Sequence, residues 1–341
     1  MLFQENIWSD YPLSTRIATT VCYAGVFGDV ISVEEMVSRF GQIDRNEFSS
    51  ALEKLIITGR VIVRDGYAAL PELDGKIDLK VTEVEITSML LKSRIGYLRR
   101  FGRNPAIKFV GVSGSLAAGN PVRDRDNTID LDVFVITRNQ CIWLYGIPAS
   151  FRRMFKRKSE EPSLCFNLVF DESDLAISNR NFYTATEIIN VIPVSGLEMY
   201  RRFLRVNSWV DTYYPGFSGS SSPPVRSASY DIINKGLYFV YTLLRSMKNF
   251  SLKPLRNLTF RRDPLSGINY NRISHYYGGY QALVQRRFAA IAERWFPEMI
   301  DSSLIEKLFP DDLSIALRNG EIDIHKLMEE RELQLDYGKY E

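Results

Sequence analysis

The sequence reads IKFVGVSGS at residues 107–115 and IDLDVFVI at residues 129–136, and these are its two most informative stretches. The first is an apolar run that ends in a Gly-Ser pair, and the second is apolar except at Asp130 and Asp132. Short apolar runs bounded by turn residues predict buried β-strands. Successive side chains of a strand point to opposite faces, so we expect the two carboxylates on the same face.

Two carboxylates one pleat apart predict a cation site. They repel each other and lose solvation unless a positive charge lies between them, and Mg²⁺ is a hard ion that prefers carboxylate and phosphate oxygens. The preceding Gly114-Ser115 turn offers backbone N–H groups and a hydroxyl to an anion. The pattern therefore predicts a phosphoryl- or nucleotidyl-transfer site. The alternative is a polar hairpin with two solvated aspartates, but Asp130 interrupts an otherwise apolar strand.

The spacing of these residues resembles a known signature. Gly114-Ser115, fourteen intervening residues and then an Asp-Leu-Asp-Val run are similar to the motif of the DNA polymerase β nucleotidyltransferase superfamily. The resemblance implies that Gly114 and Ser115 bind the triphosphate of a nucleotide. It also implies that Asp130 and Asp132 are catalytic residues that hold two Mg²⁺ ions.

A wider part of the chain resembles one branch of that superfamily. Stretch 112–120 is similar to a prokaryotic group of mostly uncharacterised nucleotidyltransferase-domain proteins, as are residues 164–168 and 207–209. The resemblance covers roughly residues 85 to 300. Asn120, the last residue of the first stretch, is assigned to nucleotide binding on this basis.

The resemblance also implies a third carboxylate from a later strand, and here the sequence departs from it. By alternation along the strand predicted at 164–170, the position that faces the site is Asn167. An amide oxygen ligates a cation weakly and cannot take a proton from an attacking hydroxyl. Asp171 lies about 13 Å further along an extended strand. Either another residue, water or the substrate fills this role, or the site binds nucleotide without transferring it.

Basic residues are concentrated after the predicted core. The stretch 245–262 carries arginines and lysines and no acid. The resemblance implies that a helical domain contributes a cation to the triphosphate, and Arg245 or Lys248 is the candidate. The alternative is that each of them lies on a solvated face.

The chain divides into several expected parts. Residues 1–75 predict a winged-helix-like domain and residues 76–216 a nucleotidyltransferase core, whose mixed strands and flanking helices give an α/β (α+β) fold. A linker rich in serine and proline covers 217–227. A helical domain is expected at 228–327, and a loosely held charged tail at 328–341.

Elements of the core can be placed from apolar spacing. A connecting helix is expected at about 81–101, followed by strands at 107–112, 129–137 and 164–170. A further helix is expected at about 140–156.

The first 75 residues predict three helices and a hairpin. Ser14, Ser32 and Asp44 are the expected helix starts, and an Asp-Gly turn joins two short strands at 61–70. Three helices closed by a hairpin form a winged helix.

Winged helices often bind DNA, but the third helix here argues against it. It carries Arg45 and Lys54 together with Asp44, Glu47 and Glu53, so it lacks a basic face. Specific binding of duplex DNA is therefore not expected. A packing, dimerisation or acceptor-docking role is the alternative.

Composition indicates an ordinary globular protein. The 341 residues are 45% hydrophobic and 25% charged, with a net charge of +2. Three isolated cysteines predict free buried thiols rather than disulfides or a zinc site. The first residues lack the features of a signal peptide, and no apolar run is long enough to span a bilayer. We therefore expect a cytoplasmic protein with no membrane partner.

Three functions are compatible with these patterns. The first is an Mg²⁺-dependent nucleotidyltransferase that moves a nucleoside monophosphate from an NTP to an acceptor and releases pyrophosphate. The second is a nucleotide-binding regulatory or sensor protein without transfer activity, and the third is a winged-helix DNA-binding regulator. The acceptor stays open among a small molecule, RNA and protein.

Overall fold

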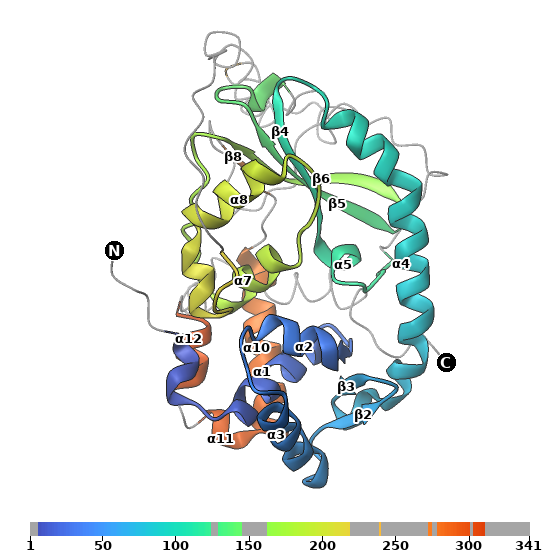
Figure 1. Ribbon diagram of the computed structural model, residues 1–341, viewed down its shortest axis with the longest axis vertical. Helices are drawn as coiled ribbons and strands as arrows, with labels where there is room; N and C mark the ends of the chain where they lie inside the picture. The colour runs from blue at the N-terminus through green and yellow to red at the C-terminus, as the bar shows by residue number, and fades with distance from the viewer. Residues whose placement is uncertain are drawn as a thin grey trace, which may run out of the picture.

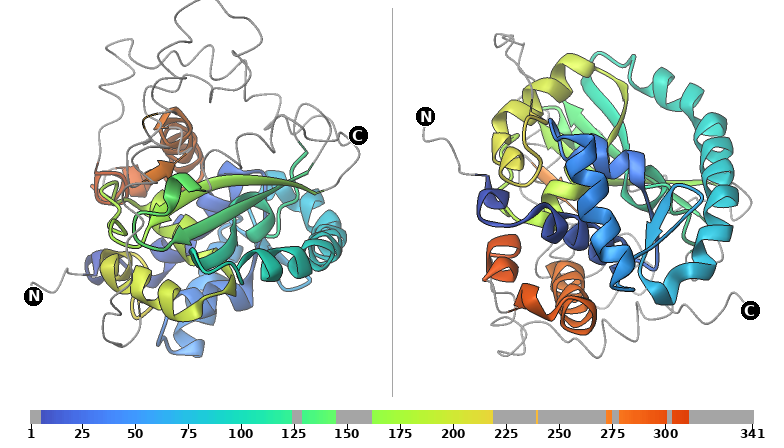
Figure 2. Two further views of the ribbon diagram at one scale, coloured as in Figure 1. Left: turned by 90° about the horizontal axis from the view of Figure 1, so that it is seen from above. Right: turned by 60° about the horizontal axis from the view of Figure 1, so that its bottom comes forward.

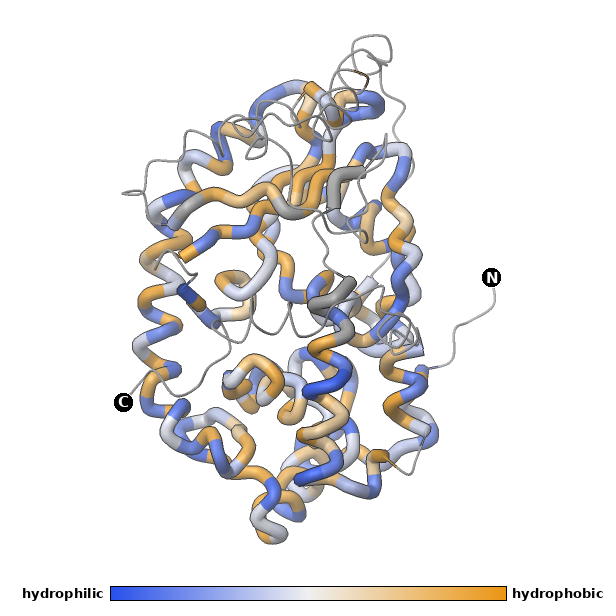
Figure 3. Tube along the Cα trace, turned by 180° about the vertical axis from the view of Figure 1, so that it is seen from behind, coloured by the Kyte–Doolittle hydropathy of each residue, from blue (hydrophilic) through white to orange (hydrophobic). Residues whose placement is uncertain are grey.

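The computed structural model describes residues 6–123, 129–144, 162–218, 239, 272–274, 278–300 and 303–310. Within these ranges the chain is a mixed α/β protein, as expected, with a small antiparallel sheet and a larger mixed sheet (Figure 1). Apolar residues concentrate along the strands of the larger sheet (Figure 3).

Residues 6–70, which we call the N-terminal unit, contain three α-helices and the small sheet. Its strands follow the order β1-β3-β2, and both neighbouring pairs are antiparallel. The elements are η1 (Ile7–Asp10), α1 (Leu13–Val26), β1 (Ile31–Ser32), α2 (Val33–Arg39), α3 (Arg45–Ile57), β2 (Ile62–Arg64) and β3 (Tyr67–Ala69).

Side-chain caps begin two of these helices where the sequence predicts them. Ser32 accepts a hydrogen bond from the backbone N–H of Glu35 at 3.4 Å. Asp44 accepts from the backbone N–H groups of Asn46 and Glu47 at 2.7 and 3.0 Å. Such caps satisfy N–H groups that have no partner inside the helix, and each contributes about 1 kcal/mol.

The predicted Asp-Gly hairpin turn is confirmed between β2 and β3. Asp65 and Gly66 have φ angles of 52° and 80°, so both lie in the left-handed region. A two-residue turn of this kind matches the natural twist of the strands that it joins.

Helix α4 (Asp74–Phe101) runs from the N-terminal unit to the larger sheet along one side of the molecule (Figures 1 and 2). The sequence predicts that this helix begins near Val81. That prediction is wrong, because the helix begins at Asp74. The early turns carry polar residues such as Lys76 and Asp78, so apolar spacing does not mark a helix there. A charged residue, Lys80, occupies one of the buried positions of this segment.

The larger sheet, called the central sheet below, has the strand order β7-β4-β5-β6-β8 within the described chain. β5 and β6 are parallel and the other neighbouring pairs are antiparallel. The three predicted strands are confirmed to within one residue at each end, whereas β7 and β8 are not predicted by the sequence. The strands are β4 (Ile107–Ser113), β5 (Asp130–Thr137), β6 (Ser163–Asp171), β7 (Ile192–Ser195) and β8 (Arg272–Ser274).

Two clusters of buried side chains cover opposite faces of the central sheet. Val133 of β5 belongs to a cluster with Leu98 of α4. Phe134 lies on the other face, where its ring centroid is 5.0 Å from that of Phe203. The helices that follow β6 are α7 (Phe182–Ile189), α8 (Leu197–Val206) and η3 (Ser208–Thr212).

The C-terminal helices pack against the N-terminal unit, with α10 in contact with α1. Ile17 of α1, Phe134 of β5 and Phe288 of α10 belong to the same buried cluster. One hydrophobic core therefore runs through the N-terminal unit, the central sheet and the C-terminal helices. These helices are α10 (Gly278–Trp295), α11 (Pro297–Ile300) and α12 (Leu304–Leu308).

Several predicted segments fall partly or wholly beyond the described residues. Residues 142–144 are helical, within the helix expected at about 140–156, although Gln140 and Cys141 are not, and residues 145–156 lie outside the described ranges. The linker after Ser218 and the tail at 328–341 are also outside the described ranges.

Two predictions from composition can be compared with the structure. Cys22, Cys141 and Cys165 are buried thiols that form no disulfide among the described residues, as expected. Burial raises the pKa of Cys141 to about 11, so this residue is a neutral thiol at physiological pH. Among the helices of the described ranges, none combines the length and the apolar character that crossing a membrane requires.

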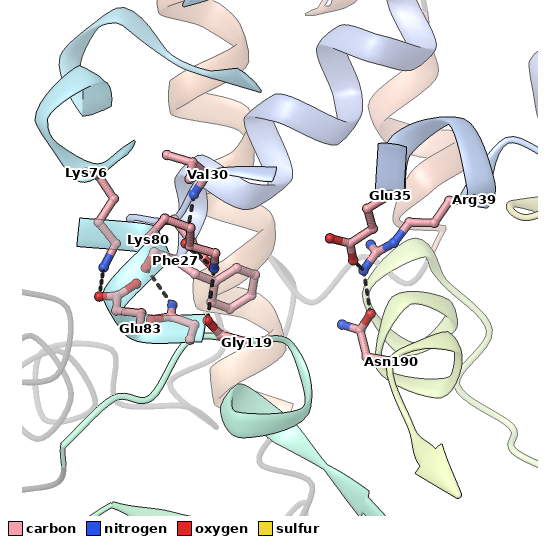
Figure 4. A network of polar contacts seen from close by, with 11 residues as sticks. Phe27, Val30, Glu35, Arg39, Lys76, Lys80, Glu83, Gly119 and Asn190 are labelled. Atoms are coloured by element: carbon pink, nitrogen blue, oxygen red, sulfur yellow. Dashed lines mark hydrogen bonds and ion pairs between the residues drawn. The ribbon is translucent and has the colours of Figure 1, made fainter. Parts of the chain in front are cut away.

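A polar contact joins the N-terminal unit to α7. Arg39 of α2 forms an ion pair with Glu35. It also donates a hydrogen bond to the side-chain oxygen of Asn190, the C-cap residue of α7, at 2.6 Å (Figure 4). Glu187 lies half-buried on the same helix. Burial raises its pKa to about 7, although the positive charge of Arg39 acts in the opposite direction.

Replacing Glu187 with glutamine is expected to stabilise the protein at pH 8 and to leave its stability nearly unchanged near pH 4. The folded-state pKa of this carboxyl is about 7, above its ordinary value of 4.5. Its contribution to stability is therefore fully present below the unfolded-state pKa and is lost as the pH rises through the folded-state value. The melting temperatures of parent and variant should diverge between pH 4 and pH 8. Melting temperatures that change with pH in parallel would contradict the raised pKa of Glu187.

Candidate active site

The predicted Gly-Ser turn follows directly on β4. Ser113 is the last residue of that strand, and the short helix α5 (Gly114–Ala117) comes next. Gly114 has a φ angle of 70°, in the left-handed region that favours glycine. Ser115 is half-buried, and its carbonyl oxygen accepts a hydrogen bond from the N–H of Asn120 at 2.9 Å.

The carboxylate of Asp132 lies against this turn. Asp132 on β5 is paired directly with Ser113 on β4. A Cβ atom placed on Gly114 would overlap with Oδ2 of Asp132 and would lie 3.0 Å from its Cγ. Only glycine leaves room for the carboxylate in this position, so the structure brings together the two halves of the sequence motif.

Asp130 lies two residues before Asp132 at the beginning of β5. Both aspartates are half-buried, and they alternate with Leu131 and Val133, which are fully buried. Further along the strand, Phe134 lies on the same face as the aspartates and packs against the aromatic rings of Phe109 and Phe203. The expected alternation is therefore observed, and the carboxylates stand where the aromatic side of the sheet ends.

β6 supplies the neighbouring position, but its register changes there. Cys165 lies opposite Asp132 and Leu168 lies opposite Phe134, so two residues of β6, Phe166 and Asn167, stand against one residue of β5. Phe166 packs in the cluster on the α4 side of the sheet, whereas Leu168 packs with the cluster on the other side. Simple alternation does not place Asn167 across such a bulge. Its side chain lies outside the described part of the structure, so its role stays a prediction.

Asp171 stands at the far end of β6, opposite Thr137, as the sequence argument expects. It is buried and accepts hydrogen bonds from the N–H of Gln140 at 2.6 Å and from the N–H and hydroxyl of Ser173 at 3.0 and 2.7 Å. Burial raises the pKa of this carboxyl, and the hydrogen bonds oppose that change. Asp171 therefore holds the loops after β5 and β6 and does not supply the third carboxylate.

Of three further residues predicted to bind the nucleotide, the structure describes one. Asn120 is buried, and its side-chain amide donates to the carbonyl oxygen of Phe27 in the N-terminal unit at 3.5 Å. A contact between Asn120 and a nucleotide stays a prediction. Arg245 and Lys248 lie outside the described residues, so their roles also stay predictions.

The donor atoms of Asp130 and Asp132 suit a magnesium ion. Mg²⁺ in proteins is usually held by one or two carboxylates, while water and substrate phosphates complete its octahedron. Over the described residues, no group of three or more His, Cys, Asp or Glu side chains is arranged to hold a metal.

One residue beside the site, Lys80 of α4, is missed by the sequence analysis. Its Nζ lies 3.0 Å from the carbonyl oxygen of Gly119, just after α5, and it forms an ion pair with Asp29 of the N-terminal unit (Figure 4). Lysines are rarely buried, and this one is distant in sequence from its partners. No local pattern could have revealed the contact.

Comparisons of the chain with protein-family models, with curated proteins and with solved structures find no match. The function of the site therefore has to be inferred from its own residues.

Proposed function

We propose that this protein is an Mg²⁺-dependent nucleotidyltransferase, which moves a nucleoside monophosphate from an NTP to an acceptor and releases pyrophosphate. One observation carries the proposal: the left-handed turn at Gly114 lies against the carboxylate of Asp132, with Asp130 beside it on β5. An NTP complexed with magnesium presents phosphate oxygens to turn amides and a cation to carboxylates. The turn and the paired aspartates together suit both parts of that substrate.

Each residue has a stated role in this proposal. Asp130 and Asp132 hold Mg²⁺, which when bound neutralises charge on the triphosphate and on the leaving pyrophosphate. Gly114 and Ser115 bind phosphate oxygens through backbone N–H groups and the serine hydroxyl. Both aspartates are half-buried, and partial burial strengthens their attraction for the cation relative to open water. The chain contributes positioning and charge complementarity.

The detailed architecture is part of the same proposal. Three helices and the strand order β1-β3-β2 support a winged-helix-like domain at residues 1–75. The mixed central sheet, with the Gly-Ser turn between β4 and β5, supports a nucleotidyltransferase core at 76–216. Helices α10, α11 and α12 support a helical domain at 228–327.

A second candidate is a nucleotide-binding regulatory protein that does not transfer. The residue of β6 paired with Asp132 is Cys165, and Asn167 follows in the bulge, so this part of β6 offers no carboxylate. Transfer to a hydroxyl needs a group that accepts its proton. In this second proposal the site binds Mg–NTP, and the N-terminal unit responds to the bound nucleotide.

One experiment separates these proposals. The protein is incubated with each labelled NTP and Mg²⁺ in the presence of small molecules, RNA or protein, and pyrophosphate release, label transfer and nucleotide binding are measured. Release and transfer support the enzyme, whereas binding without release supports the regulatory protein. Absence of binding for all four NTPs contradicts both.

The N-terminal unit is not expected to bind duplex DNA specifically. The exposed side of α3 carries Arg45 and Lys54 together with Glu47 and Glu53, and Arg45 already pairs with Glu34 at 3.0 Å. Neutralisation of phosphates by cations drives most binding to DNA, and this helix has no excess of cations. Fluorescence anisotropy with defined duplexes at several salt concentrations checks this. A salt-sensitive, submicromolar complex would contradict it.

A further inference from the structure

A buried ion pair joins α4 to the N-terminal unit. Nζ of Lys80 lies 2.8 and 2.7 Å from the two carboxylate oxygens of Asp29 (Figure 4). Lys80 is 5% exposed and Asp29 is 8% exposed. Removing both charges from water is costly, so a buried pair of this kind is weak evidence for a purely stabilising role.

The third donor of this lysine contacts the loop that follows the Gly-Ser turn. Nζ donates to the carbonyl oxygen of Gly119 at 3.0 Å, and with the two Asp29 oxygens this accounts for all three N–H donors of an ammonium group. The carboxylate of Asp29 is itself fixed by the N–H of Val30 at 2.8 Å. The loop therefore rests on a group that the N-terminal unit holds in place.

Residues 114–120, which comprise α5 and the loop after it, are joined end to end by backbone hydrogen bonds. The N–H of Ala118 donates to the carbonyl oxygen of Gly114 at 3.1 Å, and the N–H of Asn120 donates to that of Ser115 at 2.9 Å. At its beginning the loop lies against Asp132. One short segment therefore contacts Lys80 at Gly119 and Asp132 at Gly114.

We propose that Lys80 is a positioning residue for the Gly-Ser turn and that the N-terminal unit, through Asp29, is the support on which the nucleotide site is built. This inference rests on the proposed function and extends it to the N-terminal unit. Lys80 contacts the loop and not the nucleotide. It holds the turn amides and the Asp132 carboxylate in one arrangement, so that both face the same Mg–NTP.

The competing explanation is that the pair only stabilises the fold, and a double variant separates the two. Lys80→Met alone leaves the Asp29 carboxylate buried without its cation, which destabilises the protein for reasons unrelated to the loop. Asp29→Asn combined with Lys80→Met removes both charges, and the asparagine oxygen can still accept from Val30. The double variant therefore removes the cost of an unpaired buried charge while the contact with Gly119 stays lost.

Lys76 provides a matched control on the same helix. It lies one turn before Lys80 and pairs with Glu83, in a contact where both side chains are mostly buried (Figure 4). Lys76→Met therefore removes a lysine from a comparable ion pair while leaving the contact with Gly119 in place. Glu83→Gln is added in this control so that no carboxylate loses its cation.

The first measurement is hydrogen exchange of the full chain without nucleotide. In the double variant at positions 29 and 80, amides of residues 115–120 are expected to exchange about tenfold faster than in the parent, as the loss of a hydrogen bond from a charged group implies. The control at positions 76 and 83 is expected to match the parent in this segment. Unchanged exchange of the loop in the Lys80 variant would overturn the inference.

The second measurement is the affinity for Mg–NTP by calorimetry. The double variant is expected to bind about tenfold more weakly at a melting temperature close to that of the control, since a stabilising role alone would change the melting temperature and not the affinity. Equal affinity of parent and double variant overturns the positioning role. If the parent itself binds no NTP, the proposed function fails, and the exchange measurement still decides whether Lys80 anchors the loop.

Discussion

Asp132→Asn is expected to fold as the parent does and to lose Mg²⁺-dependent nucleotide binding, with an affinity for Mg–NTP lower by more than about 100-fold. Asparagine has the shape of aspartate, so it still fits against Gly114, but it has no charge to offer a cation. Loss of a direct metal ligand should exceed the roughly 10–100-fold typical of outer-shell partners. Removing one of two neighbouring carboxylates also relieves their repulsion, so the melting temperature should hold or rise. Asp130→Asn should act in the same direction.

The control for this variant is Asp44→Asn. It makes the same chemical change at an exposed helix cap, where asparagine caps as well as aspartate does. Its nucleotide affinity and its melting temperature should both match those of the parent in calorimetry and thermal unfolding. Parental affinity in Asp132→Asn and in Asp130→Asn would refute the assignment of the two carboxylates.

Gly114→Ala is the second change with a large expected effect. The added methyl group overlaps with Oδ2 of Asp132 and lies 3.0 Å from its Cγ, so the carboxylate has to move. A misplacement of about 1 Å costs about 100-fold in rate in other enzymes, and we expect a loss of similar size in Mg–NTP binding or turnover. The left-handed backbone adds only about 1–2 kcal/mol of destabilisation.

Gly59→Ala isolates the backbone effect from the steric one. Gly59 has a similar φ angle of 67°, but a Cβ atom there meets nothing within 4 Å. Both variants should lose comparable stability in thermal unfolding, and only Gly114→Ala should lose nucleotide affinity. Equal affinity in the two variants would show that the contact between the turn and Asp132 is unimportant.

Local sequence was sufficient for the elements whose cause is local. The strands at Ile107–Ser113 and Asp130–Thr137 are each built around a short apolar run, and their bounds lie within one residue of the ends predicted from those runs. Asp44 caps its helix because its short side chain reaches two N–H groups of the next turn. The contact between the turn and Asp132 follows from the antiparallel pairing of β4 with β5, which the structure shows.

Interactions between distant residues could not be predicted in this way. Lys80 and Asp29 are 51 positions apart, and nothing in the helix pattern indicates that this lysine is buried. The bulge in β6 depends on how two strands pair, so alternation from Cys165 could not fix the side on which Asn167 lies. The continuous core likewise depends on α10 packing on α1, which neither helix reveals alone.

The most direct test of the proposed site is calorimetric titration of the full-length protein with each of the four NTPs, in Mg²⁺ and again with the metal removed by a chelator. The paired aspartates and the turn at Gly114 predict that at least one NTP binds in Mg²⁺ and that binding is lost when the metal is removed. They also predict that Asp132→Asn shows no binding in either condition. If no NTP binds to the parent in Mg²⁺, or if binding is the same without the metal, the assignment of this site to Mg–NTP is wrong.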